Sequence, residues 1–479
     1  MQAGTESQLA RQPAFTISVL SQRPIMNRAI RAALAAVVAT IIIILQLQCA
    51  PARPDKYLSQ SENLGVYHSD PNHLWNRIHR HFHTRVAPDG EVFGEDETDV
   101  LLWLETNYLL TGASHQKAIQ LLDEFIKVDG QRLITDPLMR AVFQHDLWAV
   151  FDWLATTNDR YPPETRHPRE TGELQVRLAK VIKSVALTKN QINALPSNFR
   201  AAVASKAFSA RYDPEHNTRA FLPPEMDEPA GPWVTINSFV EPVAISHARE
   251  FSSSAFAVMI NLPGGRNATI AYLKKLWDFP EAFVADTTFP AERRLMLNPE
   301  LPQFPSSTQF ALIRRMLLID ADGEIVPSNL IESIQIRVFH DPSTVDYPHQ
   351  GDFYGDQDFF EFRMSRRKLF AGESGGIRAV ARDETGFMTF STHGFDWFED
   401  AAPKLWRKRR VVLEGCGDCH RNIGIRSVMS VHSMLRPNPF SEWFDAQSPF
   451  SMAAEWKRRR SDWGLMEALL RSNASRRKR

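Results

Sequence analysis

The pattern of apolar residues divides the chain into a helical first part and a β-rich middle. Between residues 69 and 210, apolar side chains recur every three or four positions, as Leu174, Leu178 and Val181 do, and this is the spacing of one helix face. A globular protein buries such a face. The pattern therefore predicts a helical domain over residues 69–210, preceded by a polar linker at 53–68.

Local signals mark where several of these helices begin and end. Ser114 is a suitable N-cap, Asp129-Gly130 predicts a helix end, and Asp136-Pro137 predicts the next start. Thr188 and Gln191 have the spacing of a capping box, in which each side chain bonds the backbone N–H of the other residue. These signals predict that the first part of the chain is an all-α block.

From about residue 219 the pattern changes to short runs rich in Pro, Phe, Val and Ile. Such runs predict strands, which we place at 234–240, 255–262, 310–319, 331–339, 359–364 and 379–390. Asp320-Ala321-Asp322-Gly323 predicts a hairpin turn between the third of them and a short strand at 324–326, and residues 268–277 are predicted to form a helix. We therefore expect a β-rich, sandwich-like domain over residues 219–400.

The final part of the chain, residues 401–479, is predicted to be a small α-helical module. We expect one helix over 416–429 and a terminal helix over 452–470. Together the three parts predict a multidomain α+β protein, with a helical N-terminal domain, a β-rich middle and a small helical C-terminal module.

The first 52 residues have the pattern of a targeting segment. Three arginines precede an uncharged apolar run at 32–45, which has the length of a signal-peptide core and is short for a membrane span. Met26 is an alternative start. Cys49 raises the alternative of lipoprotein processing, although Gln48 stands where a small residue is expected; retention as an uncleaved membrane anchor is the third. All of them predict export to the bacterial periplasm or cell envelope.

Composition adds the expectation of a large folded body with an uneven charge distribution. The 479 residues are 43% hydrophobic, which is enough to bury large cores. The formal net charge is zero, but residues 401–479 carry 17 Lys and Arg against 7 Asp and Glu, whereas residues 53–400 carry 35 against 48. A basic module thus follows an acidic body. Its charges would be solubilising, dock on that body or attract an acidic partner, and we expect no nucleic-acid partner.

Gly415–His420 contains the most specific pattern in the chain. Cys416 and Cys419 are three residues apart and His420 follows directly, which is the C-x-x-C-H pattern of covalent haem attachment. Each thiol adds to one vinyl group of the porphyrin, and the adjacent imidazole binds the iron. Zinc binding would need two further ligands, for which only two histidines lie nearby. A thioredoxin-like dithiol or a structural disulfide is a further alternative.

The motif resembles that of the c-type cytochromes, and the resemblance covers the attachment box alone. It implies one haem c, with thioether links at Cys416 and Cys419 and His420 as the proximal ligand of the haem iron. The sixth ligand stays open. Its candidates are the histidines and methionines around the motif: His393, His432, Met429, Met434, Met452 and Met466. A vacant sixth position would instead indicate peroxide or ligand chemistry.

A second resemblance covers more of the chain. Trp75–Arg80, Leu110–His115 and Ser365–Gly372 resemble large exported proteins of planctomycete-type bacteria, a group without an established function. This resemblance implies a localisation and no mechanism.

The sequence therefore predicts an exported haem protein whose role is electron transfer to a redox partner. Two alternatives belong to other classes. One is a peroxidase-like haem enzyme, and the other is a non-haem envelope binding or scaffold protein with a structural or zinc-binding cysteine pair. No lipase-type serine elbow, P-loop, zinc-protease motif or dinucleotide fingerprint is present in the sequence.

Two further groups of residues have the chemistry of metal ligands. His79 and His83 share one face of a predicted helix while His81 points elsewhere, so three-way chelation is disfavoured. The carboxylates at 352–358 lack the spacing of an EF-hand, and a solvated loop is the simpler interpretation.

Overall fold

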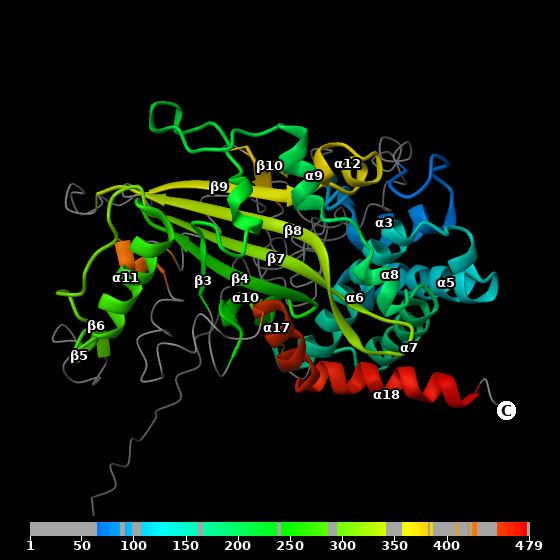
Figure 1. The fold of residues 1–479 in the computed structure, drawn as a ribbon. Coiled ribbons are helices and arrows are strands. Elements are labelled where there is room, and N and C mark those ends of the chain that lie inside the picture. The colour runs from blue at the N-terminus through cyan, green and yellow to red at the C-terminus, as the bar shows by residue number, and fades with distance from the viewer. Residues whose placement is uncertain are drawn as a thin grey trace, which may run out of the picture. The chain divides into compact units, whose positions relative to one another are not determined.

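The protein is built around one six-stranded antiparallel sheet (Figure 1). In this computed structural model the strand order is β10-β9-β8-β7-β4-β3. The bounds are β3 Val234–Ile236, β4 Ser254–Asn261, β7 Gln309–Ile319, β8 Ile325–Phe339, β9 Gln357–Met364 and β10 Ile377–Ala379. Within the part of the chain that the structure describes, three two-stranded ribbons accompany it: β1 Arg85–Val86 with β2 Val92–Phe93, β5 Phe283–Ala285 with β6 Leu295–Leu297, and β11 Thr385–Gly386 with β12 Arg409–Arg410.

The structure describes residues 65–476 except for several internal stretches: 87–91, 98–106, 161–165, 237–240, 286–294, 342–356, 382–383, 387–408, 411–419, 421–423 and 429–447. The targeting segment and residues 53–64 of the predicted linker lie outside the described residues. The linker prediction is wrong at its end, because Val66 and Tyr67 are buried in the core. Gln60–Arg479 form one compact unit. Within the described residues, no helix is both long and apolar enough to cross a membrane.

The helices lie mainly around one end of the sheet (Figure 1). Those of the first part are α3 Leu74–His83, α5 Gly112–Lys127, α6 Pro137–Arg160, α7 Pro168–Ser184, α8 Lys189–Asn193 and α9 Asn198–Ser205. The remaining ones are α10 Ile245–Glu250, α11 Gly265–Trp277, α12 Arg366–Phe370, α17 Pro449–Arg458 and α18 Ser461–Arg476. The predicted mixed α+β class is confirmed. The layout as three domains, with a sandwich-like middle and a separate haem module, stays a prediction.

The β7–β8 hairpin forms where the sequence predicts it. The Asp320 side chain accepts hydrogen bonds from the backbone N–H groups of Asp322 and Glu324, both at 2.9 Å, and Gly323 has a φ of 92°, which a glycine adopts without strain. The strand segments predicted at 324–326 and 331–339 form one continuous strand, β8, which passes through Pro327, where the ladder with β7 is irregular. A proline is tolerated in a strand at such an irregularity.

Some helix boundaries agree with the local signals and others do not. The capping box of Thr188 and Gln191 is present, and α6 begins at Pro137 as predicted. Ser114 is not an N-cap, because α5 already begins at Gly112. The terminal helix predicted over 452–470 is two helices, since the chain turns between α17 and α18.

The helix predicted over 416–429 is also wrong at its C-terminal end. Gly424–Ser427 form a single 3₁₀ turn. Gly424 has a φ of 56°, which ends a right-handed α-helix.

Helix α6 is buried on all sides, which the apolar stripe in its sequence did not predict. From Ala141 to Leu154 all side chains are buried except Ala149, which is half-buried. Gln144 lies within this stretch and is bonded to the end of β7, because its amide donates to the Ile319 carbonyl at 2.8 Å and accepts from the Ile319 N–H at 2.9 Å. The same amide also donates to the Ile182 carbonyl of α7 at 3.2 Å. One side chain therefore connects the sheet to two helices.

Replacing Gln144 by leucine should lower the free energy of unfolding by about 3 kcal/mol, because the substitution leaves buried backbone groups of Ile319 without hydrogen bonds. Urea unfolding followed by circular dichroism measures the effect. The matched control is Gln116→Leu on the exposed face of α5, which should change stability by less than about 0.5 kcal/mol. Equal effects of the two substitutions would show that Gln144 does not hold the helix to the sheet.

Candidate functional site

The structure describes one member of the predicted attachment motif, His420. Cys416 and Cys419 lie outside the described residues. So do four of the predicted sixth ligands, which are His393, His432, Met429 and Met434. Of the remaining two, Met466 packs fully buried in the core with α6 and α7, and Met452 is half-buried on α17.

The imidazole of His420 is oriented by a backbone carbonyl. Its Nδ1 lies 2.8 Å from the carbonyl oxygen of Ser427. A carbonyl only accepts, so Nδ1 carries the proton and the lone pair is on Nε2. Ser427 is held in turn, because its hydroxyl donates to the Gly424 carbonyl at 2.7 Å. Metal-binding histidines commonly donate one ring N–H to a carbonyl in this way while the other nitrogen binds the metal.

Arg337 of β8 fixes the turn that carries this carbonyl. Its guanidinium donates to the Ser427 carbonyl at 3.1 Å and also to the Ser427 hydroxyl. Gln357 of the neighbouring strand accepts from its Nε. Arg337 is only 7% exposed. In the sequence, Arg337 stands between two apolar residues of a predicted strand. This pattern could have indicated a buried arginine with a structural role, but our prediction did not use it.

The surroundings of His420 favour its neutral form. Burial lowers the pKa of His420, and the guanidinium of Arg337, with Nη1 3.5 Å from Nδ1, lowers it further. The neutral imidazole is the form that binds a metal ion. The donor set around His420 therefore fits an axial haem ligand.

A second histidine, His247, lies beside His420. The two ring centroids are 6.4 Å apart and the ring planes differ by 10°. Burial lowers the pKa of His247 to about 4, and His420 and Arg314 contribute to the shift. Nothing in the sequence indicated this pair, because His247 is a single histidine on the short helix α10, far from His420 along the chain.

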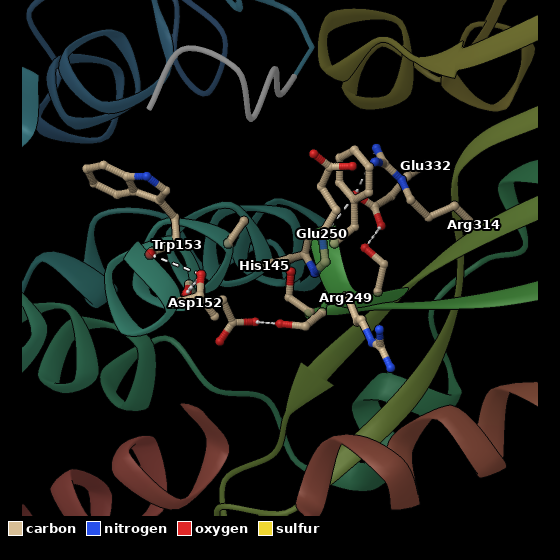
Figure 2. Close-up of a pocket in the computed structure, with 13 residues that line it drawn as sticks. His145, Asp152, Trp153, Arg249, Glu250, Arg314 and Glu332 are labelled. Carbon is tan, nitrogen blue, oxygen red and sulfur yellow. Dashed lines mark hydrogen bonds and ion pairs between the residues drawn. The ribbon is translucent and has the colours of Figure 1, made fainter. Parts of the chain in front are cut away.

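Further charged side chains meet in a small pocket between α6 and the sheet. Figure 2 shows Asp152 and Trp153 at one end of this pocket, Arg314 and Glu332 at the other, and His145 between them. The cavity volume is about 30 Å³, which is room for one or two water molecules. The pocket is too small for an organic substrate, so we interpret its side chains as a buried polar network.

His145 and Glu332 form a buried ion pair in this network. His145 Nε2 lies 2.9 Å from a Glu332 oxygen, and Nδ1 lies 3.1 Å from the Leu317 carbonyl. Both ring nitrogens face acceptors, so the ring carries two protons. Burial alone would lower the pKa of His145, but Glu332 raises it above the usual value. Arg314 and His145 likewise outweigh burial and lower the pKa of Glu332 to about 2.

A second buried cluster surrounds Lys457 of α17, which is fully buried. Its ammonium lies 2.7 Å from Asp152 and 3.1 Å from Asp462. Ser252 is also within 2.9 Å, which brings a serine hydroxyl next to a lysine. The lysine is bound between two carboxylates, so we interpret this serine and lysine as parts of a buried ion-pair cluster.

The third cluster contains two of the histidines singled out in the sequence. His79, His83 and Asp146 have potential ligand atoms within 4.8 Å of one another. As predicted, His81 points elsewhere, and its Nε2 lies 2.8 Å from the Ser114 carbonyl. Asp146 is bound through both oxygens by the buried guanidinium of Arg366. A divalent cation would add excess positive charge beside Arg366, so we interpret the cluster as a structural ion pair with neutral histidines.

The stability that the His145–Glu332 pair contributes should depend on pH. Because the folded pKa of His145 is raised, the contribution is complete below about pH 6.5 and is lost as the pH rises through the folded pKa. The difference in free energy of unfolding between the protein and His145→Gln should therefore shrink between about pH 6 and pH 9. Denaturant titrations at several pH values measure it. A difference that grows with pH would contradict a protonated His145.

Removing one partner of the Asp146–Arg366 pair should be costly. Asp146→Asn leaves the Arg366 guanidinium buried without its counter-charge, at a cost of about 3–5 kcal/mol. The double variant Asp146→Leu with Arg366→Met removes both charges and should recover a large part of that loss, as measured by a double-mutant cycle in urea. Additive losses would show that the two side chains act independently.

Comparison with family models, curated proteins and solved structures gives no match for this chain. The interpretation of the site therefore rests on its own geometry.

Proposed function

We propose that this chain is an exported c-type haem protein that transfers electrons through one covalently bound haem. In this proposal Cys416 and Cys419 form the thioether links and His420 is the proximal ligand. The basic segment that contains them is then a small cytochrome c-like module of an envelope protein, in the periplasm or attached to the membrane through the N-terminal segment. When bound, the haem iron supplies one-electron redox chemistry.

The observation that carries the proposal is the hydrogen bond between His420 Nδ1 and the Ser427 carbonyl. It fixes the tautomer in which Nε2 has the lone pair, and it fixes the orientation of the ring. The C-x-x-C-H spacing gives the same histidine the role of iron ligand. The sequence pattern and the side-chain geometry are independent observations, and both favour His420 as a ligand of the iron.

Arg337 has a positioning role in this proposal. It holds Ser427 through both its carbonyl and its hydroxyl, so the proximal ring is oriented from a strand of the central sheet. Burial lowers the pKa of His420, and the positive charge of Arg337 lowers it further. A ligand oriented from a buried strand changes little in position when the iron changes charge, which favours fast electron transfer.

The charge distribution supports an acidic redox partner only in part. Some of the basic residues of 401–479 dock on the protein itself, because Lys457 pairs with Asp152 and the Arg458 guanidinium donates to the Ile325 carbonyl at 2.7 Å. The cationic residues near the attachment motif are the ones that would attract an acidic partner.

Covalent haem is the direct test. The full chain, exported in a host that supplies the haem-attachment machinery, should give a haem-staining band on a denaturing gel. Replacing Cys416 and Cys419 by alanine should abolish the stain, whereas Cys49→Ala, which removes the third cysteine, should leave it unchanged.

The proposal fails if the exported chain carries no covalent haem and Cys416 and Cys419 are recovered as free thiols or as a disulfide. That result would favour the non-haem scaffold or zinc-binding alternatives.

A further inference from the structure

We propose that His247 is the second axial ligand of the haem iron, opposite His420. The inference rests on the proposed covalent haem and adds to it a ligand that the sequence did not indicate. It makes the iron six-coordinate with two imidazoles.

The separation of the two rings carries the inference. With metal–nitrogen bonds of about 2.0 Å and about 1.1 Å from each nitrogen to its ring centroid, two imidazoles on opposite sides of one metal ion have centroids about 6.2 Å apart. The His247 and His420 centroids are 6.4 Å apart, with planes only 10° from parallel.

The chemistry of the two rings agrees with this geometry. Both are partly buried, and the Ser427 carbonyl that accepts from His420 Nδ1 leaves the lone pair on His420 Nε2. Among the described residues, the ring of His247 contacts the rings of Phe256 and His420 and makes no hydrogen bond. Binding of a metal ion by the lone pair of a ring nitrogen would compensate for the desolvation of the His247 imidazole.

The two histidine-bearing segments share one hydrophobic core. Val243, just before α10, belongs to the same buried cluster as Ile425 and Val428, which follow His420. The Ile425 N–H also donates to the Gln303 side chain at 3.0 Å. Packing against the sheet therefore brings the segments together independently of any contact between the imidazoles.

The segment after α10 is anchored by hydrogen bonds to buried carboxylates. The Ser252 hydroxyl donates to Asp152 at 3.0 Å, and Ser254 donates to Glu332. Both carboxylates belong to the buried charge clusters under the sheet. α10 is thus connected to the rigid part of the protein, as a ligand-bearing element should be if the iron is to keep one coordination geometry in both oxidation states.

Ligation by His247 has a functional consequence. Two imidazole ligands give a lower reduction potential than a histidine–methionine pair, and they leave no open position for peroxide. The chain would then be an electron carrier and not a peroxidase-like enzyme.

Optical and electron paramagnetic resonance spectra of the purified haem-staining protein test the assignment. The wild type should show a low-spin, six-coordinate iron. His247→Ala should give a high-spin iron that binds carbon monoxide, and added imidazole should restore the low-spin spectrum. His247→Met keeps a ligand in place and should remain low-spin with a higher reduction potential. The control His216→Ala, at an exposed histidine, should leave the wild-type spectrum unchanged.

Two results would overturn the assignment while leaving covalent haem established. One is a wild-type iron that is already high-spin and accessible to ligands. The other is a low-spin spectrum that His247→Ala does not change, which would assign the sixth position to a residue such as His393 or Met434. Absence of covalent haem would overturn the proposed function and this inference together, and the haem stain separates that case from the other two.

Discussion

The fold depends on three consecutive polar residues of α6 that are buried among apolar ones. Gln144, His145 and Asp146 are at most 2% exposed, and each would cost several kcal/mol if it were left without partners. Successive residues of a helix point about 100° apart, so three of them can be satisfied only if structure surrounds the helix. Gln144 is bonded to β7 and α7, and His145 to β7 and β8. Asp146 is bonded to α12. This requirement places α6 inside the protein and fixes its rotation.

Buried charges connect the C-terminal helices to the same core. Lys457 brings α17 to Asp152 of α6, and Asp462 at the start of α18 joins this pair. Burying these charges costs desolvation free energy. An unpaired charge at this depth would destabilise the fold strongly, so the cluster favours the one arrangement in which all its charges are paired. Part of the charge asymmetry between the basic C-terminal segment and the acidic body is therefore internal to the protein.

The candidate haem site lies where these constraints meet the sheet. Arg337 orients the Ser427 carbonyl that fixes His420, while α10 presents His247 from a segment anchored by Ser252 and Ser254. The His420 ring is thus oriented from the sheet, and the segment that follows His247 is bonded to the buried charge clusters. The two segments approach each other because they pack on the same apolar cluster, which also contains Val243 and Ile425.

Features that depend on a few adjacent residues could be predicted from the sequence. The Asp320–Gly323 turn, the capping box at Thr188 and the common face of His79 and His83 all follow from local backbone geometry, and the structure contains each of them. Predictions that depend on longer stretches of sequence agreed less well with the structure. The helix expected over 416–429 does not continue through Gly424, because one positive φ outweighs the helical pattern around it.

The sequence by itself therefore determined the mixed α and β class and the positions of several strands along the chain, and it predicted the attachment motif. Only the tertiary structure decided that His247 lies beside His420 and that α6 is buried on all sides. The physical reason is the distance along the chain. The residues of a short motif are neighbours in the sequence, so their chemistry can be recognised there. Two residues far apart in the sequence come into contact only after the strands have paired and the core has packed.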